Sequence, residues 1–149
     1  MFLAYDGSHT YMGRDGVRDE YLSNGVPAEI EQQWRDELDE KRRAAITEPG
    51  NWQSVSYFQH HGDHTHLQEI LDAGPLGEWW ERCAYLETTL GYIEFTCRMH
   101  YPVERLAEAC RFIHRHAGQL GRDGVAEDQP PSRLPDLLAR AERLADSLT

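Results

Sequence analysis

The feature of this sequence that most constrains its fold is an apolar seam between residues 76 and 100. Its members recur at alternating steps of three and four residues, in the order Leu76, Trp79, Cys83, Leu86, Leu90, Ile93, Cys97 and His100. This spacing places them along one face of an α-helix. A second stripe makes the same helix apolar on another side: Tyr85, Tyr92 and Met99. The pattern predicts a central helix that other elements must cover on several sides.

Two helices are predicted before the central one. The first begins near Pro27, which suits a first helical turn, and ends at Pro49–Gly50. Its apolar stripe is formed by Ile30, Trp34, Leu38 and Ala45. The second is short and begins at a capping box between Thr65 and Gln68, with Gly74 as its stop.

Two more helices are predicted after the central one. Pro102 opens the first, which carries apolar residues at three-four spacing and should end at Gly118 or Gly121. The last helix carries Leu134, has Pro135 and Asp136 in its first turn, and should fold back on the bundle or exchange onto a partner chain. The polar, proline-containing stretch 122–132 between them predicts an exposed linker.

Two segments are less regular. Residues 2–5 and 9–12 flank an Asp6-Gly7-Ser8 turn, which is typical of a β-hairpin. Residues 51–61 fit a helix but also contain Val55 and Phe58, which favour strands. We therefore predict a mainly α fold, a bundle of four or five helices with a small N-terminal hairpin. The alternative is an α+β fold in which residues 54–58 add a strand to the hairpin.

Size and charge limit the classes of function. With 149 residues, the chain is expected to form a single domain over residues 1–149. A net charge of −11 disfavours nucleic acids and anionic membranes and suits a basic protein partner. Arginine far outnumbers lysine, which is typical of a GC-rich bacterial genome. Three cysteines without a C-x-x-C pair predict buried thiols, and the absence of a signal-peptide pattern predicts a cytoplasmic protein.

One stretch carries metal-ligand chemistry. Residues 60–66 hold four histidines and Asp63, and Glu69 follows one turn later. Imidazole and carboxylate groups suit Zn²⁺, Ni²⁺ or Fe²⁺. The predicted ligands are His61, His64 and His66, with Glu69 as the fourth ligand and Asp63 as the alternative to it. The order of the residues matches neither H-E-x-x-H nor another named metal motif, and a plain polar loop is the alternative.

Charged groups elsewhere in the sequence predict a partner-binding surface, a candidate general base, an ion pair and a basic strip. An acidic run on the first helix is the preferred partner-binding surface: Asp36, Glu37, Asp39 and Glu40. His100 continues the apolar seam, and Glu104 is its candidate partner as a general base. Glu94 and Arg98 are spaced as an i,i+4 ion pair. A basic strip near the predicted end of the helix after Pro102 matches the helix dipole: Arg111, His114, Arg115, His116 and Arg122.

Three functions follow from these observations. The first is a small acidic interaction module, such as an inhibitor, an immunity factor or an accessory subunit, without catalytic activity. The second is a metal-dependent enzyme or metal sensor that uses the histidine cluster. The third is a small-molecule binder in a bundle pocket lined by the aromatic residues Trp79, Trp80, Tyr85 and Tyr92. The apolar stripes also fit a homo-oligomer. The chain carries no phosphate-binding glycine loop and no nucleophile elbow, so common nucleotide-driven and hydrolase chemistry is disfavoured.

Overall fold

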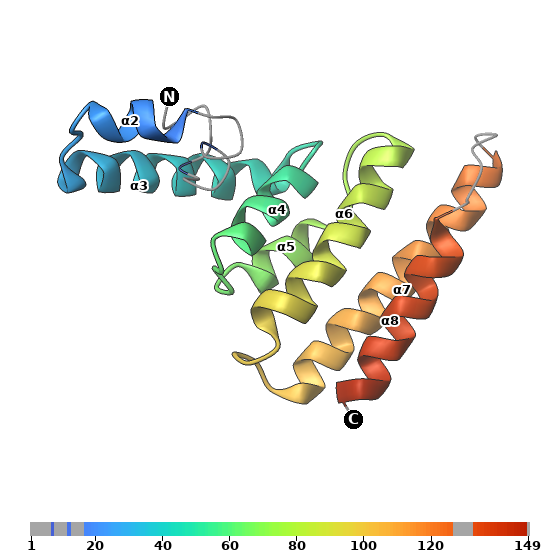
Figure 1. Ribbon diagram of the computed structural model, residues 1–149. Coiled ribbons are helices and arrows are strands. Elements are labelled where there is room, and N and C mark those ends of the chain that lie inside the picture. Colours follow the sequence, from blue (N-terminus) through green and yellow to red (C-terminus); the bar gives the residue numbers. More distant parts are fainter. Residues whose placement is uncertain (1–6, 8–11, 13–16, 127–132, 149) are drawn as a thin grey trace. The chain divides into compact units, whose positions relative to one another are not determined.

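The computed structural model describes residues 7, 12, 17–126 and 133–148, which contain helices and turns but no strand (Figure 1). Seven α-helices occur in these residues: α2 (Arg18–Ser23), α3 (Ala28–Ala44), α4 (Trp52–His60), α5 (Leu67–Ala73), α6 (Trp79–Tyr92), α7 (Val103–Ala126) and α8 (Leu134–Leu148). A 3-10 turn, η2 (Ala45–Thr47), follows α3, and a π turn, η3 (Ile93–Cys97), follows α6. The mainly α prediction is confirmed. The predicted hairpin falls on residues 2–12, which lie outside the described residues except for Gly7 and Met12.

The chain divides into two compact units, residues 1–44 and residues 45–149. In unit 1, the Tyr21 hydroxyl of α2 donates a hydrogen bond of 2.7 Å to the carboxylate of Glu31 in α3. Arg35 pairs with the same carboxylate at 3.1 Å. Leu38 is the buried residue of α3, whereas Ile30, predicted to share its stripe, is exposed. The predicted stripe is therefore only partly covered. The single-domain organisation stays a prediction.

In unit 2, α6 is the centre, as the apolar seam predicts. It packs against α4, α7 and α8 (Figure 1). Side chains from both predicted stripes are buried, among them Cys83, Leu86 and Leu90 from the seam and Tyr85 and Tyr92 from the second stripe. At its start, the Glu81 carboxylate accepts the backbone N–H of Glu78 at 2.9 Å, which satisfies a donor that the helix leaves open.

The predicted central helix does not continue to residue 100. Residues 93–97 form a π turn, and the chain leaves the helix at Arg98. A π turn bonds residues i and i+5, so side chains at three-four spacing no longer share one face after it. Cys97 is still buried, but Met99 is 89% exposed and His100 is also exposed. The prediction that these two residues belong to the core is wrong.

Residues 52–60 form α4, so the strand alternative for this segment is wrong. Tertiary contacts decide the ambiguity, because Val55 and Phe58 are both fully buried within unit 2. The preceding Asn51 is also buried, and its amide donates to the carbonyls of Ile46 at 3.0 Å and Gly74 at 2.9 Å. These bonds tie the start of α4 to the end of α5.

The capping box predicted between Thr65 and Gln68 does not form. Helix α5 begins at Leu67 after His66, which makes no side-chain cap. Thr65 instead turns back to Asp63, whose carboxylate accepts its backbone N–H at 3.0 Å and its hydroxyl at 2.6 Å. Because the Thr65 hydroxyl bonds to Asp63 in this local turn, it does not cap α5.

Helix α7 is longer than predicted, since it passes through Gly118 and Gly121 and reaches Ala126. Residues 122–126 are therefore helical and do not belong to a linker. Helix α8 folds back along α7, as predicted, and also contacts α6 (Figure 1). Its apolar face is buried at Leu134, Leu137, Ala141 and Leu144.

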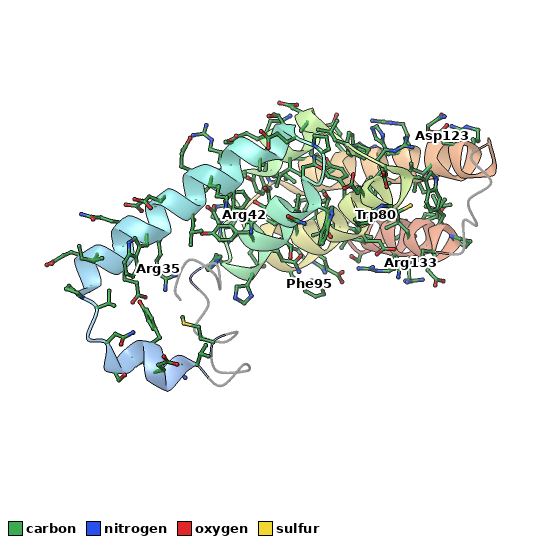
Figure 2. All side chains as sticks on the ribbon, turned by 90° about the horizontal axis from the view of Figure 1, so that it is seen from above. Arg35, Arg42, Trp80, Phe95, Asp123 and Arg133 are labelled. Atoms are coloured by element: carbon green, nitrogen blue, oxygen red, sulfur yellow. The ribbon has the colours of Figure 1, made fainter. Side chains whose placement is uncertain are left out.

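Ion pairs connect α6 to the end of α7 and to the residue before α8. Figure 2 shows Asp123 of α7 and Arg133, just before α8, at the same end. Asp123 pairs with Arg82 of α6 at 3.3 Å, and Arg133 lies 3.8 Å from Glu87 of α6. None of the helices among the described residues is long and apolar enough to cross a membrane.

Candidate functional site

The histidine-rich loop between α4 and α5 is held by tyrosines from distant parts of the chain. The buried Tyr92 hydroxyl of α6 donates to the carbonyl of Asp63 at 2.6 Å. The Tyr101 hydroxyl donates a short hydrogen bond to the carbonyl of His64. These two bonds fix the loop backbone against the central helix and the start of α7. The side chains of the loop therefore have defined positions.

The structure brings only two of the four predicted metal ligands together. His66 Nδ1 lies 3.3 Å from the Glu69 carboxylate. His61 packs instead on the ring of Tyr57, with ring centres 4.4 Å apart. His64 stacks in parallel on His100 at 3.6 Å. Among the described residues, no group of three or more His, Cys, Asp or Glu side chains is placed to hold a metal ion.

His66 bridges two carboxylates. Its Nδ1 faces Glu69, and its Nε2 lies 3.2 Å from Asp63. Burial would raise the pKa of the Asp63 carboxyl, but the hydrogen bonds from Thr65 and the nearby imidazoles of His66 and His64 hold it below its ordinary value. The three side chains form a polar clasp at the start of α5.

The predicted pair of His100 and Glu104 is not formed as a buried base. Both residues are exposed, and His100 faces His64 instead. The basic strip is also placed differently from the prediction. Because α7 continues to Ala126, the strip lies within the helix, where His114 pairs with Glu142 of α8 at 3.2 Å. It links two helices and is not set at a helix end.

The aromatic residues proposed for a pocket have separate surroundings. Tyr85 is fully buried and donates to the carbonyl of Ile70 at 2.5 Å. Trp79 donates through its indole N–H to the carbonyl of Leu120 at 2.9 Å. Trp80, labelled in Figure 2, is 55% exposed. These side chains pack in the core or lie in solvent, and this observation does not favour the aromatic-pocket hypothesis.

The three cysteines are free and buried. Burial raises the pKa of the Cys83 and Cys110 thiols to about 11 and that of Cys97 to about 12. A thiol is a nucleophile only as a thiolate, so these groups are unreactive at neutral pH. They fill the core, as the sequence predicts.

A groove of about 920 Å³ lies between α5 and α7. The sequence gives no sign of it, because its two walls are about 30 residues apart along the chain. Its lining includes Asp72, Glu104, Arg105, Glu108, Arg111 and Arg115, together with Leu71, Ala109 and Phe112. Since the lining holds three acids and three arginines, it favours neither sign of ligand charge.

The acidic run on α3 is solvent-exposed at all four positions, Asp36, Glu37, Asp39 and Glu40. At about 100° per residue, Asp36 and Glu40 lie on the side of the helix opposite the buried Leu38. Asp36 accepts a hydrogen bond from Gln32 at 2.9 Å. Within the part of the chain that the structure describes, Asp36, Glu37 and Glu40 make no ion pair.

Comparisons of the chain with models of protein families, with curated proteins and with solved structures find no match.

Proposed function

We propose that the protein is a small interaction module that docks a basic partner protein on the acidic face of α3, defined as Asp36, Glu37, Asp39 and Glu40. The observation that carries the proposal is a set of exposed carboxylates on one helix with no ion pair at Asp36, Glu37 or Glu40 among the described residues. Lys41 follows directly but forms no pair with Glu37 or Glu40. These negative charges are therefore available to a partner.

The geometry suits docking by charge. Asp36 and Glu40 point away from the buried side of α3, so a partner can reach them without disturbing Leu38. Each exposed pair formed with a partner contributes little affinity, about 0.2–1 kcal/mol. A cluster of like charges instead accelerates encounter and rejects partners of the same sign. The binding should accordingly weaken as the salt concentration rises.

The test compares two triple variants of equal charge. The first, Asp36→Asn/Glu37→Gln/Glu40→Gln, neutralises the acidic face. The control, Glu20→Gln/Glu48→Gln/Glu108→Gln, removes three other exposed carboxylates. Each variant and the wild type are purified from the source cell at low salt after chemical cross-linking, and co-purifying proteins are quantified.

A basic protein should accompany the wild type and the control in stoichiometric amount and be lost from the acidic-face variant. High salt applied before cross-linking should prevent the capture of this partner by the wild type and by the control. Equal retention by both variants, or the absence of any stoichiometric basic partner, would refute the proposal. Circular dichroism on each variant checks that α3 is still folded.

A second candidate function is divalent-metal binding at His61, His64, His66 and Glu69. The contact between His66 and Glu69 at 3.3 Å favours it. To complete a site, His61 and His64 would have to leave Tyr57 and His100. Calorimetric titration with zinc and nickel, repeated with His61→Ala/His64→Ala, tests this function. Equal heats for the wild type and the variant would remove it.

A further inference from the structure

A small basic pocket lies between η3 and the second half of α8. Its volume is about 350 Å³, near the lower end of ligand-binding cavities. Six residues line it: Glu94, Arg98, Arg140, Arg143, Leu144 and Ser147. Figure 1 shows the C-terminal end of α8 returning beside the connection between α6 and α7. The fold thus brings three arginines together from two segments more than 40 residues apart.

The three arginines lack acidic partners. Arg98, Arg140 and Arg143 form no ion pair with any residue that the structure describes. The Arg98 guanidinium makes one polar contact, a hydrogen bond of 3.3 Å to the Ser147 hydroxyl. Three positive charges and one carboxylate leave the lining with a charge of +2, in a chain whose net charge is −11. Such a local excess of positive charge attracts anions.

The π turn explains why Arg98 is available. The spacing of Glu94 and Arg98 predicts an ion pair on an α-helix. Residues 93–97 instead form the wider π turn, and no ion pair joins the two side chains. Arg98 is directed toward Ser147 of α8. π turns are frequent at functional sites, and here the turn supplies one wall of the pocket.

We propose that this pocket binds the phosphoryl group of a phosphate ester or of free phosphate. A phosphoryl group carries about −1.5 to −2 charges at neutral pH and three acceptor oxygens. This matches a lining of charge +2 with three guanidinium groups. The Ser147 hydroxyl donates to the carbonyl of Leu144 at 2.9 Å and accepts from Arg98, so it orients that guanidinium. Arginine binds phosphate oxygens through paired N–H groups, which gives directional as well as electrostatic recognition.

Glu94 shapes the selectivity of the pocket. Its carboxylate repels an anion, so it lowers affinity for a bare phosphate ion. It also accepts a hydrogen bond from a hydroxyl or amino group carried by the ligand. A phosphate ester with such a donor is therefore the better fit. This site is separate from the acidic face of α3, and the inference is independent of the proposed function.

The experiment measures binding to the full chain at low ionic strength by calorimetry and thermal shift. The probes are inorganic phosphate, O-phosphoserine and succinate, a dicarboxylate of similar charge. Arg140→Gln/Arg143→Gln removes two arginines of the pocket. Arg111→Gln/Arg115→Gln is the matched control on α7, with the same change in net charge.

The wild type and the control should bind phosphate or phosphoserine and be stabilised by it. The pocket variant should bind at least about tenfold more weakly, as expected for lost hydrogen bonds to a charged group. Glu94→Gln should tighten inorganic phosphate binding by about threefold, since it removes one repulsive charge. Tighter binding of phosphoserine than of phosphate would identify an ester as the ligand, and the reverse would identify free phosphate.

Three outcomes would overturn the inference. The first is that neither phosphate nor phosphoserine binds the wild type. The second is that both arginine double variants lose binding equally, which would show a general charge effect. The third is that succinate binds as tightly as the phosphoryl probes. Thermal unfolding without ligand checks that the variants retain the fold, and Glu94→Gln tests the same pocket without removing an arginine.

Discussion

Replacing Gly124 with alanine should destabilise the protein, although alanine normally stabilises a helix relative to glycine. Gly124 lies near the end of α7, against the indole ring of Trp79 at the start of α6. A Cβ atom at position 124 would lie 2.8, 2.8 and 2.9 Å from three atoms of that ring. The indole cannot swing away freely, because its N–H donates to the carbonyl of Leu120 at 2.9 Å.

The expected magnitude follows from two opposing effects. Alanine in place of glycine within a helix raises the free energy of unfolding by about 0.5–1 kcal/mol. Overpacking a well-filled contact typically lowers the free energy of unfolding by about 1–3 kcal/mol. Gly118 provides the control in the same helix, since the nearest atom to its added Cβ is 4.0 Å away, on Arg122. The helix-propensity gain is common to both variants, so their difference isolates the packing effect of about 1–3 kcal/mol.

The assay is urea and thermal unfolding of the wild type, Gly118→Ala and Gly124→Ala. Gly118→Ala should be slightly more stable than the wild type. Gly124→Ala should melt roughly 3–9 °C below Gly118→Ala, at about 3 °C per kcal/mol for a chain of this size. Equal stabilisation by both substitutions would refute the close contact between α6 and α7.

A double-mutant cycle identifies the contact. The three atoms nearest position 124 all belong to the indole ring, which alanine lacks. In a Trp79→Ala background, Gly124→Ala should therefore no longer be destabilising. If the alanine remained as harmful without the indole, its effect would have another origin than Trp79.

Three further predictions concern hydrogen bonding, pH and thiol chemistry. Tyr92→Phe should lower the free energy of unfolding by about 1–3 kcal/mol, because the Asp63 carbonyl loses its donor; unchanged urea unfolding would contradict this. Burial, and then the charge of Arg115, lowers the pKa of His116, so below about pH 6.5 the unfolded state takes up a proton that the folded state resists. Stability should therefore decrease as the pH falls through this range, and His116→Gln should flatten the profile; identical profiles would exclude His116 as the cause. A thiol reagent at neutral pH should label the three buried cysteines slowly in the native protein and fully in urea, and rapid native labelling would show that the core opens.

The positions of most helices follow from the sequence alone. The apolar seam predicts α6 as the centre, and the prolines and glycines predict the start of α3 and its stop near Pro49. The amphipathic pattern after residue 133 predicts α8 and its return onto the bundle. These features are set by local spacing and by breakers, and they need no knowledge of distant residues. The buried cysteines were predictable for the same reason.

Other features of the fold depend on contacts that the sequence does not show. Residues 52–60 become a helix because unit 2 buries Val55 and Phe58, although their propensity alone leaves helix and strand open. The π turn ends the seam early and exposes Met99, against the regular spacing.

Tertiary structure also decides which side chains meet. The histidine loop takes its shape from Tyr92 and Tyr101, more than 25 residues away. Arg98 meets Arg140 and Arg143 only because α8 folds back along α7. Local periodicity determines where a helix forms, but the meeting of distant charges depends on how the helices pack.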